Sequence, residues 1–117
     1  MKNDVTIYHN PACGTSRNTL ALIKDAGYEP KVIEYLKAGW TRKLLEEILK
    51  KAGLKARDLL RVRGTKAEEL GLTEPSSRDA DILAAMVKDP ILVERPIVVT
   101  MKGTALCRPA DKVLALL

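Results

Sequence analysis

The stretch VTIYHNPACGTSRNTLALIKDAGYEPKVIEY, residues 5–35, decides the fold of this 117-residue chain. Apolar and polar side chains alternate over 5–8, which predicts a short strand that a proline soon ends. From Gly14 the apolar residues recur at helical spacing until Gly27, a suitable C-terminal cap, and residues 31–35 predict a second strand. A strand, a helix and a strand within about 30 residues predict a right-handed βαβ unit with parallel strands.

Three helices are predicted in the middle of the chain. Thr41 can cap the first of them, which ends near Gly53, and a second short helix is expected over 56–61. Ser76 or Ser77 is expected to start the third helix. This helix must stop before the next proline, because proline lacks the amide hydrogen and clashes with the preceding turn.

The end of the chain returns to strands. β-Branched residues predict a strand over 97–100, Lys102-Gly103 is a plausible tight turn, and 104–107 is expected to pair back antiparallel. Pro109 can open a last helix. The order β-α-β, a helical block, then β-β-α predicts an α/β protein with a thioredoxin-like fold and a helical insertion in the middle. We expect a single domain over 1–117.

Composition narrows the class of protein. Lys and Arg total 20 against 15 for Asp and Glu, a formal charge of +5 that suits an anionic partner, although many charges form helical pairs such as Glu46 with Lys50. Two cysteines are too few for a disulfide framework and favour the cytoplasm. No apolar run reaches the ~18 residues that a membrane span needs, and we find no signal peptide. We therefore expect a soluble cytoplasmic protein with no membrane partner.

Cys13 is the best candidate for chemistry, because it lies where the first strand meets the first helix. Unpaired backbone N–H groups and the helix dipole favour a thiolate there, and the same amides can hold an oxyanion. His9 precedes Cys13 by four residues and Arg17 follows it by four, while Asn10 can supply hydrogen bonds around the loop. A cysteine can equally be a core residue, His9 a structural residue and Arg17 a solvated one.

The motif Cys13-Gly14-Thr15-Ser16 has serine in place of the second cysteine of a C-x-x-C pair. It cannot close a disulfide, so a thiol from elsewhere must resolve any covalent intermediate. The tyrosine-phosphatase loop is excluded as well, since it needs arginine six residues after the cysteine and Thr19 stands there. One histidine and two distant cysteines also make a zinc site unlikely on ligand count alone, so we expect no metal.

Four segments together resemble the glutaredoxin-coupled arsenate reductases: residues 8–20, 59–61, 94–100 and 106–109. The resemblance extends over essentially the whole chain and implies a thioredoxin-like fold with one essential cysteine. It implies the following site residues: Cys13 as the nucleophile, His9 and Ser16 as residues that tune it, Arg61, Arg95 and Arg108 as an arsenate-binding triad, and a cis peptide bond at Arg95-Pro96.

The sequence supports the three arginines as oxyanion ligands to different degrees. Three guanidinium groups can present forked donors to a tetrahedral oxyanion. Arg61 competes with Arg57 and Arg63, and spacing alone does not choose among them. Neighbours on a strand point to opposite faces, so Arg108 facing the site would turn Cys107 away from it, and we expect Cys107 to be structural.

The mechanism that the resemblance implies needs no bound cofactor. Cys13 attacks arsenate, glutathione attacks the arsenic adduct as a co-substrate, and glutaredoxin removes the glutathione as As(V) becomes As(III). We expect a monomer that binds arsenate, glutathione and glutaredoxin and no nucleic acid.

Two other functions stay open at this point. A glutathione-dependent thiol-disulfide oxidoreductase would use the same Cys13 without an arginine triad. An Spx-like transcriptional regulator, similar in fold, would bind RNA polymerase and often switches through C-x-x-C, which Ser16 removes here.

Overall fold

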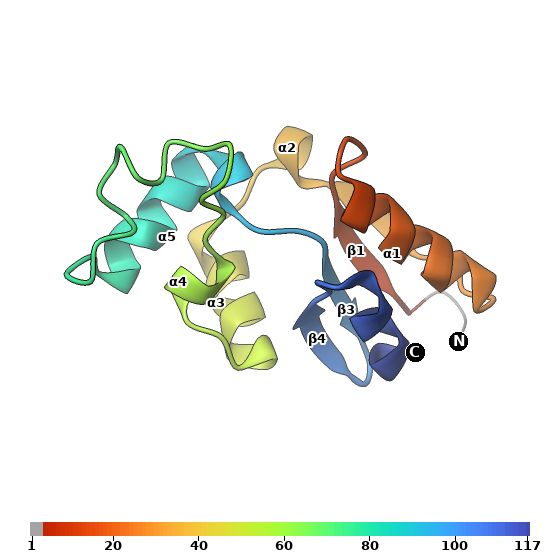
Figure 1. Cartoon of the computed structure of the whole chain (residues 1–117). Coiled ribbons are helices and arrows are strands. Elements are labelled where there is room, and N and C mark those ends of the chain that lie inside the picture. The colour runs from red at the N-terminus through yellow and green to blue at the C-terminus, as the bar shows by residue number, and fades with distance from the viewer. Residues whose placement is uncertain (1–3) are drawn as a thin grey trace. The chain divides into compact units, whose positions relative to one another are not determined.

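The computed structural model describes residues 4–117 (Figure 1). The chain divides into two compact units. The first comprises the chain up to Ala38 together with Arg95–Leu117, and the second is Gly39–Glu94. The single domain expected over 1–117 stays a prediction. No helix within residues 4–117 combines the length and apolar character needed to cross a membrane.

The first unit is built on a four-stranded mixed sheet in the order β2-β1-β3-β4. Its strands are β1 (Thr6–His9), β2 (Lys31–Glu34), β3 (Ile97–Thr100) and β4 (Gly103–Leu106). β1 pairs with β2 in parallel and with β3 antiparallel, and β3 pairs with β4 antiparallel. This is the β-α-β and β-β-α arrangement that the sequence predicted, and it confirms the α/β fold class.

Helix α1 (Gly14–Asp25) connects β1 to β2, with the short helix α2 (Tyr35–Ala38) after β2 (Figure 1). The end of α1 has the hydrogen bonds of a Schellman motif, since Gly27 N–H donates to Lys24 O and Tyr28 N–H donates to Ile23 O. Gly27 has φ +92°, a conformation that glycine adopts without a steric penalty. The predicted C-terminal cap is confirmed.

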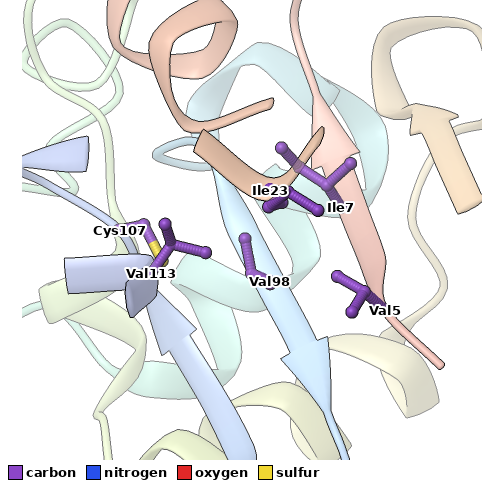
Figure 2. Close-up of a cluster of buried hydrophobic side chains, with 6 residues drawn as sticks. All are labelled: Val5, Ile7, Ile23, Val98, Cys107 and Val113. Atoms are coloured by element: carbon purple, nitrogen blue, oxygen red, sulfur yellow. The ribbon is translucent and has the colours of Figure 1, made fainter. Parts of the chain in front are cut away.

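The core of this unit lies between the sheet, α1 and the 3₁₀ helix η2 (Ala110–Leu116). Ile23 from α1 and Val98 from β3 are fully buried there, and Figure 2 shows them with the other members of the cluster. The cluster consists of Val5, Ile7, Ile23, Val98, Cys107 and Val113. Because Ile7 and Ile23 come from β1 and α1, their packing holds the strand and the helix on either side of the Cys13 loop.

The second unit is helical. Its helices are α3 (Arg42–Ala52), α4 (Ala56–Leu59), α5 (Asp79–Lys88) and the 3₁₀ helix η1 (Pro90–Leu92). Thr41 caps α3 as predicted, since its hydroxyl accepts a hydrogen bond from Leu44 N–H at 3.1 Å, and Gly53 ends that helix at φ +68°. α5 contacts both α3 and α4.

Several predicted boundaries in the second unit are wrong. α5 begins at Asp79 rather than at Ser76 or Ser77, because the Ser77 hydroxyl donates to Leu72 O at 2.8 Å and closes the preceding loop. α4 ends at Leu59 instead of residue 61, because Leu60 is extended and forms an antiparallel bridge with Val93.

The ends of the first unit also differ from the prediction in detail. The reversal between β3 and β4 occupies Met101 and Lys102, and Gly103 already pairs with Thr100. The Thr100 hydroxyl accepts a hydrogen bond from Lys102 N–H at 3.1 Å, so the turn starts one residue earlier than expected. The last helix is present, but it is 3₁₀ rather than α.

The core cluster gives a stability prediction. Replacing Ile23, which is fully buried, by alanine should lower the free energy of unfolding by about 2–5 kcal/mol, and Ile23→Val by about 1 kcal/mol. Urea denaturation followed by circular dichroism measures both. Leu114→Ala is the control, since Leu114 is half-exposed and its truncation should cost less than about 1 kcal/mol. Equal losses for Ile23→Ala and Leu114→Ala would contradict the assignment of the core.

Candidate active site

The loop between β1 and α1 places Cys13 at the first position of the helix. Cys13 is the N-cap of α1, with extended φ −95° and ψ 122°, and its carbonyl accepts the first helical hydrogen bond from Arg17 N–H at 3.0 Å. Its own N–H donates to Asn10 O at 2.9 Å and closes a tight turn. Cys13 therefore lies at the N-terminus of α1, where the amides of the first turn have no partner within the helix.

Two arginines that lie more than 80 positions after Cys13 in the sequence have their side chains near this sulfur. Arg108 Nη1 donates to Cys13 Sγ at 3.9 Å and to Arg95 O at 2.9 Å. Arg95 is itself buried, at 7% exposure. The Arg95-Pro96 peptide bond is cis, as the resemblance implied. The structure thus brings Cys13, Arg95 and Arg108 together within one unit.

The surroundings of Cys13 favour its charged form. Burial of the sulfur acts to raise the pKa of Cys13, but the backbone amide of Ser16 and the Arg95 and Arg108 side chains lower it by more. The Ser16 amide lies in the first turn of α1, where it stabilises negative charge on the sulfur. The net pKa lies below that of an ordinary cysteine, so the thiolate fraction near neutral pH is increased.

His9 and Ser16 form a buried pair close to Cys13 in the sequence. His9 Nδ1 and Ser16 Oγ lie 2.6 Å apart, and Asn10 N–H donates to the same Ser16 oxygen at 3.1 Å. Burial lowers the pKa of His9, Glu34 opposes this, and Arg17 contributes to lowering it further. His9 is therefore neutral at pH 7. Its Nδ1 can then accept the Ser16 hydroxyl hydrogen, which leaves the histidine proton on Nε2.

Arg61 belongs to the second unit. Its Nε donates to Arg63 O at 2.9 Å, and its Nη1 lies 3.8 Å from Glu94 Oε1. The backbone is anchored by Arg61 N–H donating to Leu92 O at 2.7 Å. Partial burial distinguishes it from the exposed Arg57 and Arg63, a distinction that spacing could not make. Its role as an arsenate ligand stays a prediction.

The two remaining candidates have clear positions. Arg17 Nη1 donates to Pro11 O at 2.9 Å, so this exposed side chain braces the loop. Cys107 is fully buried in the core cluster, and burial raises its pKa to about 11 (Figure 2). Cys107 and Arg108 follow directly after β4, so strand alternation does not govern their directions, although Cys107 lies in the core and Arg108 contacts Cys13.

Taken together, these contacts can support nucleophilic attack on an anion. The sulfur has lowered pKa, and amide and guanidinium donors converge on it, which is the arrangement that stabilises charge on an attacked oxyanion. The motif offers no second thiol, because position 16 is serine. Within residues 4–117, no three or more His, Cys, Asp or Glu side chains are grouped in a way that could hold a metal ion.

Known proteins are similar to this chain over nearly its whole length. The sequence matches the ArsC family over residues 8–116. It is 56% identical over 113 residues to an arsenate reductase of Rhizobium meliloti, covering 97% of this chain and 81% of the relative. An Escherichia coli K12 arsenate reductase is 49% identical over 115 residues, covering 98% and 82%. The solved structure of an arsenate reductase from Vibrio cholerae superposes with a TM-score of 0.91 at 38% identity, covering 97% of each chain. This likeness confirms the predicted thioredoxin-like fold.

The Arg108 contact gives a prediction about the thiol. Replacing Arg108 by glutamine should raise the pKa of Cys13, because the guanidinium donor that stabilises the thiolate is removed from the sulfur. At pH 7 the thiolate fraction then falls. Iodoacetamide alkylation followed by mass spectrometry across pH 5–9 measures this as a shift of the rate profile to higher pH.

The matched control for that experiment is Lys112→Gln, which removes one exposed positive charge from the same unit. Its alkylation profile should coincide with that of the unsubstituted protein. An equal shift in both variants would mean that net charge, rather than the contact with Arg108, sets the pKa of Cys13.

Proposed function

The chain belongs to the ArsC family, and we infer that it is an arsenate reductase that works through Cys13, with glutathione and glutaredoxin supplying the electrons. The observation that carries the inference is the convergence on one sulfur of the Ser16 amide, Arg95 and Arg108. A thiolate that must attack a negatively charged substrate needs positive charge and hydrogen-bond donors beside it, and this site supplies both.

The first step is attack on arsenic. The Cys13 thiolate forms a sulfur–arsenic bond with As(V), and one arsenate oxygen leaves as water after protonation. Arg95 and Arg108 neutralise the remaining oxygens, and the free amides at the start of α1 can donate to them. Arg61 completes the proposed set of arsenate ligands. Its support is the family resemblance together with its partial burial.

Reduction needs two thiols in addition to Cys13, because the motif contains no second cysteine. Glutathione forms a second sulfur–arsenic bond and displaces another water. A glutaredoxin thiolate then attacks the glutathione sulfur, and the electron pair of that bond passes to arsenic, which becomes As(III). Glutaredoxin leaves as a mixed disulfide with glutathione. Hydrolysis of the remaining bond releases arsenite and returns the Cys13 thiolate.

His9 and Ser16 support the nucleophile in this scheme without bonding to arsenic. The Ser16 hydroxyl is held by His9 and by the Asn10 amide, so the Ser16 backbone stays in place beside the sulfur. Neither an organic cofactor nor a metal ion takes part. The reaction belongs to a soluble protein of the cytoplasm, where glutathione and reduced thiols are available.

Arsenate turnover tests the proposal directly. NADPH consumption is followed with arsenate, glutathione, glutaredoxin and glutathione reductase. Turnover should depend on arsenate and on both thiol donors, and Cys13→Ser should abolish it, because a serine hydroxyl is not ionised near neutral pH. Cys107→Ala is the control and should retain turnover, since Cys107 lies in the core. A protein without arsenate-dependent turnover would sink the assignment.

Arginine variants separate arsenate reduction from thiol–disulfide exchange. Arg108→Gln should lower kcat/KM for arsenate by at least about 100-fold, and Arg108→Lys should recover part of this loss by restoring the charge without the fork. Reduction of a small glutathione mixed disulfide is measured on the same variants. If that reaction is efficient and insensitive to Arg108, the chain is a thiol-disulfide oxidoreductase instead.

A further inference from the structure

Asn10 is a buried polar residue at the junction between β1 and the Cys13 loop. It is 6% exposed, and its backbone N–H, its backbone carbonyl and its side-chain oxygen all form hydrogen bonds. Its N–H donates to Ser16 Oγ at 3.1 Å, and its backbone carbonyl accepts from Cys13 N–H at 2.9 Å. Its side-chain Oδ1 accepts from Ala12 N–H at 3.0 Å. One residue is therefore bonded to three positions of the loop and helix that carry the nucleophile.

These bonds determine which backbone amides remain free to donate a hydrogen bond to the Cys13 sulfur. The N–H groups of Ala12 and Cys13 are both directed back at Asn10, and Pro11 has none. Backbone donors from this segment to a thiolate or a bound oxyanion must therefore come from the first turn of α1. The Ser16 amide is one such donor, and it lowers the pKa of Cys13.

Asn10 also holds the residue that carries this donor. Its N–H donates to the Ser16 hydroxyl, while the Ser16 amide interacts with the Cys13 sulfur. The two ends of the loop are thus linked twice, through Ser16 and through Cys13. Only the Ala12 contact uses the Asn10 side chain, so it is the part of the arrangement that a substitution can remove.

We propose that Asn10 is a positioning residue of this site, whose side-chain carbonyl closes the Pro11-Ala12 turn and thereby holds Cys13 in place at the start of α1. The proposal rests on Cys13 being the nucleophile of the proposed function. An asparagine oxygen suits the task because it substitutes for a backbone carbonyl in such turns.

Alanine at position 10 should free the turn. Pro11 and Ala12 are exposed, so water can hydrate the Ala12 N–H once Oδ1 is gone. The turn then loses one of its restraints and keeps the bonds from Cys13 N–H to Asn10 O and from Arg17 to Pro11 O, so its geometry is held less tightly. The backbone N–H and carbonyl of residue 10 remain, so the fold is retained. The expected change is in the chemistry of Cys13 rather than in the existence of α1.

The experiment measures three quantities on Asn10→Ala, Asn10→Ser and Asn18→Ala: the pH profile of Cys13 alkylation, kcat and KM for arsenate, and the melting temperature. Asn10→Ala should be alkylated about 3- to 10-fold more slowly at pH 7, with a profile displaced to higher pH. Its kcat should fall by a similar factor while KM changes less than about twofold, because the arsenate-binding arginines are untouched.

The two other variants sharpen the result. Asn10→Ser offers a hydroxyl that can accept from Ala12 N–H more weakly, so its alkylation rate and kcat should lie between those of the wild type and Asn10→Ala. It also serves if the alanine variant does not fold. Asn18→Ala removes an exposed asparagine of α1 and should match the wild type in all three measurements.

Two outcomes would overturn the proposal. In one, Asn10→Ala has a lower melting temperature but an unchanged alkylation profile, so Asn10 would act on stability alone. In the other, Asn10→Ser behaves like Asn10→Ala despite its hydroxyl, so the acceptor would not matter. Failure of the proposed function is distinguishable, since the wild type would then lack arsenate turnover while the alkylation profiles still report on Asn10.

Discussion

A negatively charged sulfur with little exposure to water is the constraint on which the rest of this site depends. Burial alone would keep Cys13 protonated, so the protein must surround it with donors that outweigh the lost hydration. The helix start supplies one donor through Ser16, and the segments at either end of the β3–β4 hairpin supply Arg95 and Arg108. The βαβ unit and the antiparallel hairpin are therefore both required before the cysteine becomes reactive.

Serine in place of the second motif cysteine changes the use of that position. The Ser16 hydroxyl interacts with His9 Nδ1 and accepts a hydrogen bond from Asn10 N–H. Unlike a thiol, it cannot form a disulfide. Serine at position 16 thus stabilises the geometry of the loop, whereas a cysteine at this position could form a disulfide with Cys13. Any disulfide chemistry at Cys13 must then involve a thiol from outside the motif.

Local signals predicted the parts of the fold that depend on local interactions. Thr41, Gly27 and Gly53 were predicted correctly because capping depends on the residue itself and its immediate neighbours. The start of α5 was not, because Ser77 bonds to a loop that only the tertiary structure forms. For the same reason position 13 could be chosen from a strand–helix junction, whereas Arg95 and Arg108 came only from the family resemblance. No sequence pattern reports a contact across more than 80 residues.

The contrast between the two cysteines has a consequence for oxidative damage. Cys13 is the proposed nucleophile, and the only other cysteine of the sequence, Cys107, is buried in the core with its pKa raised to about 11. If peroxide converts Cys13 to a sulfenic acid, the motif offers no second thiol that could condense with the sulfenic acid to a disulfide. Rescue then falls to glutathione from solution, and where glutathione is depleted the oxidation proceeds to the irreversible sulfinic acid. In the proposed mechanism the absence of a second thiol makes turnover depend on outside thiols, and it makes recovery from oxidation depend on them as well.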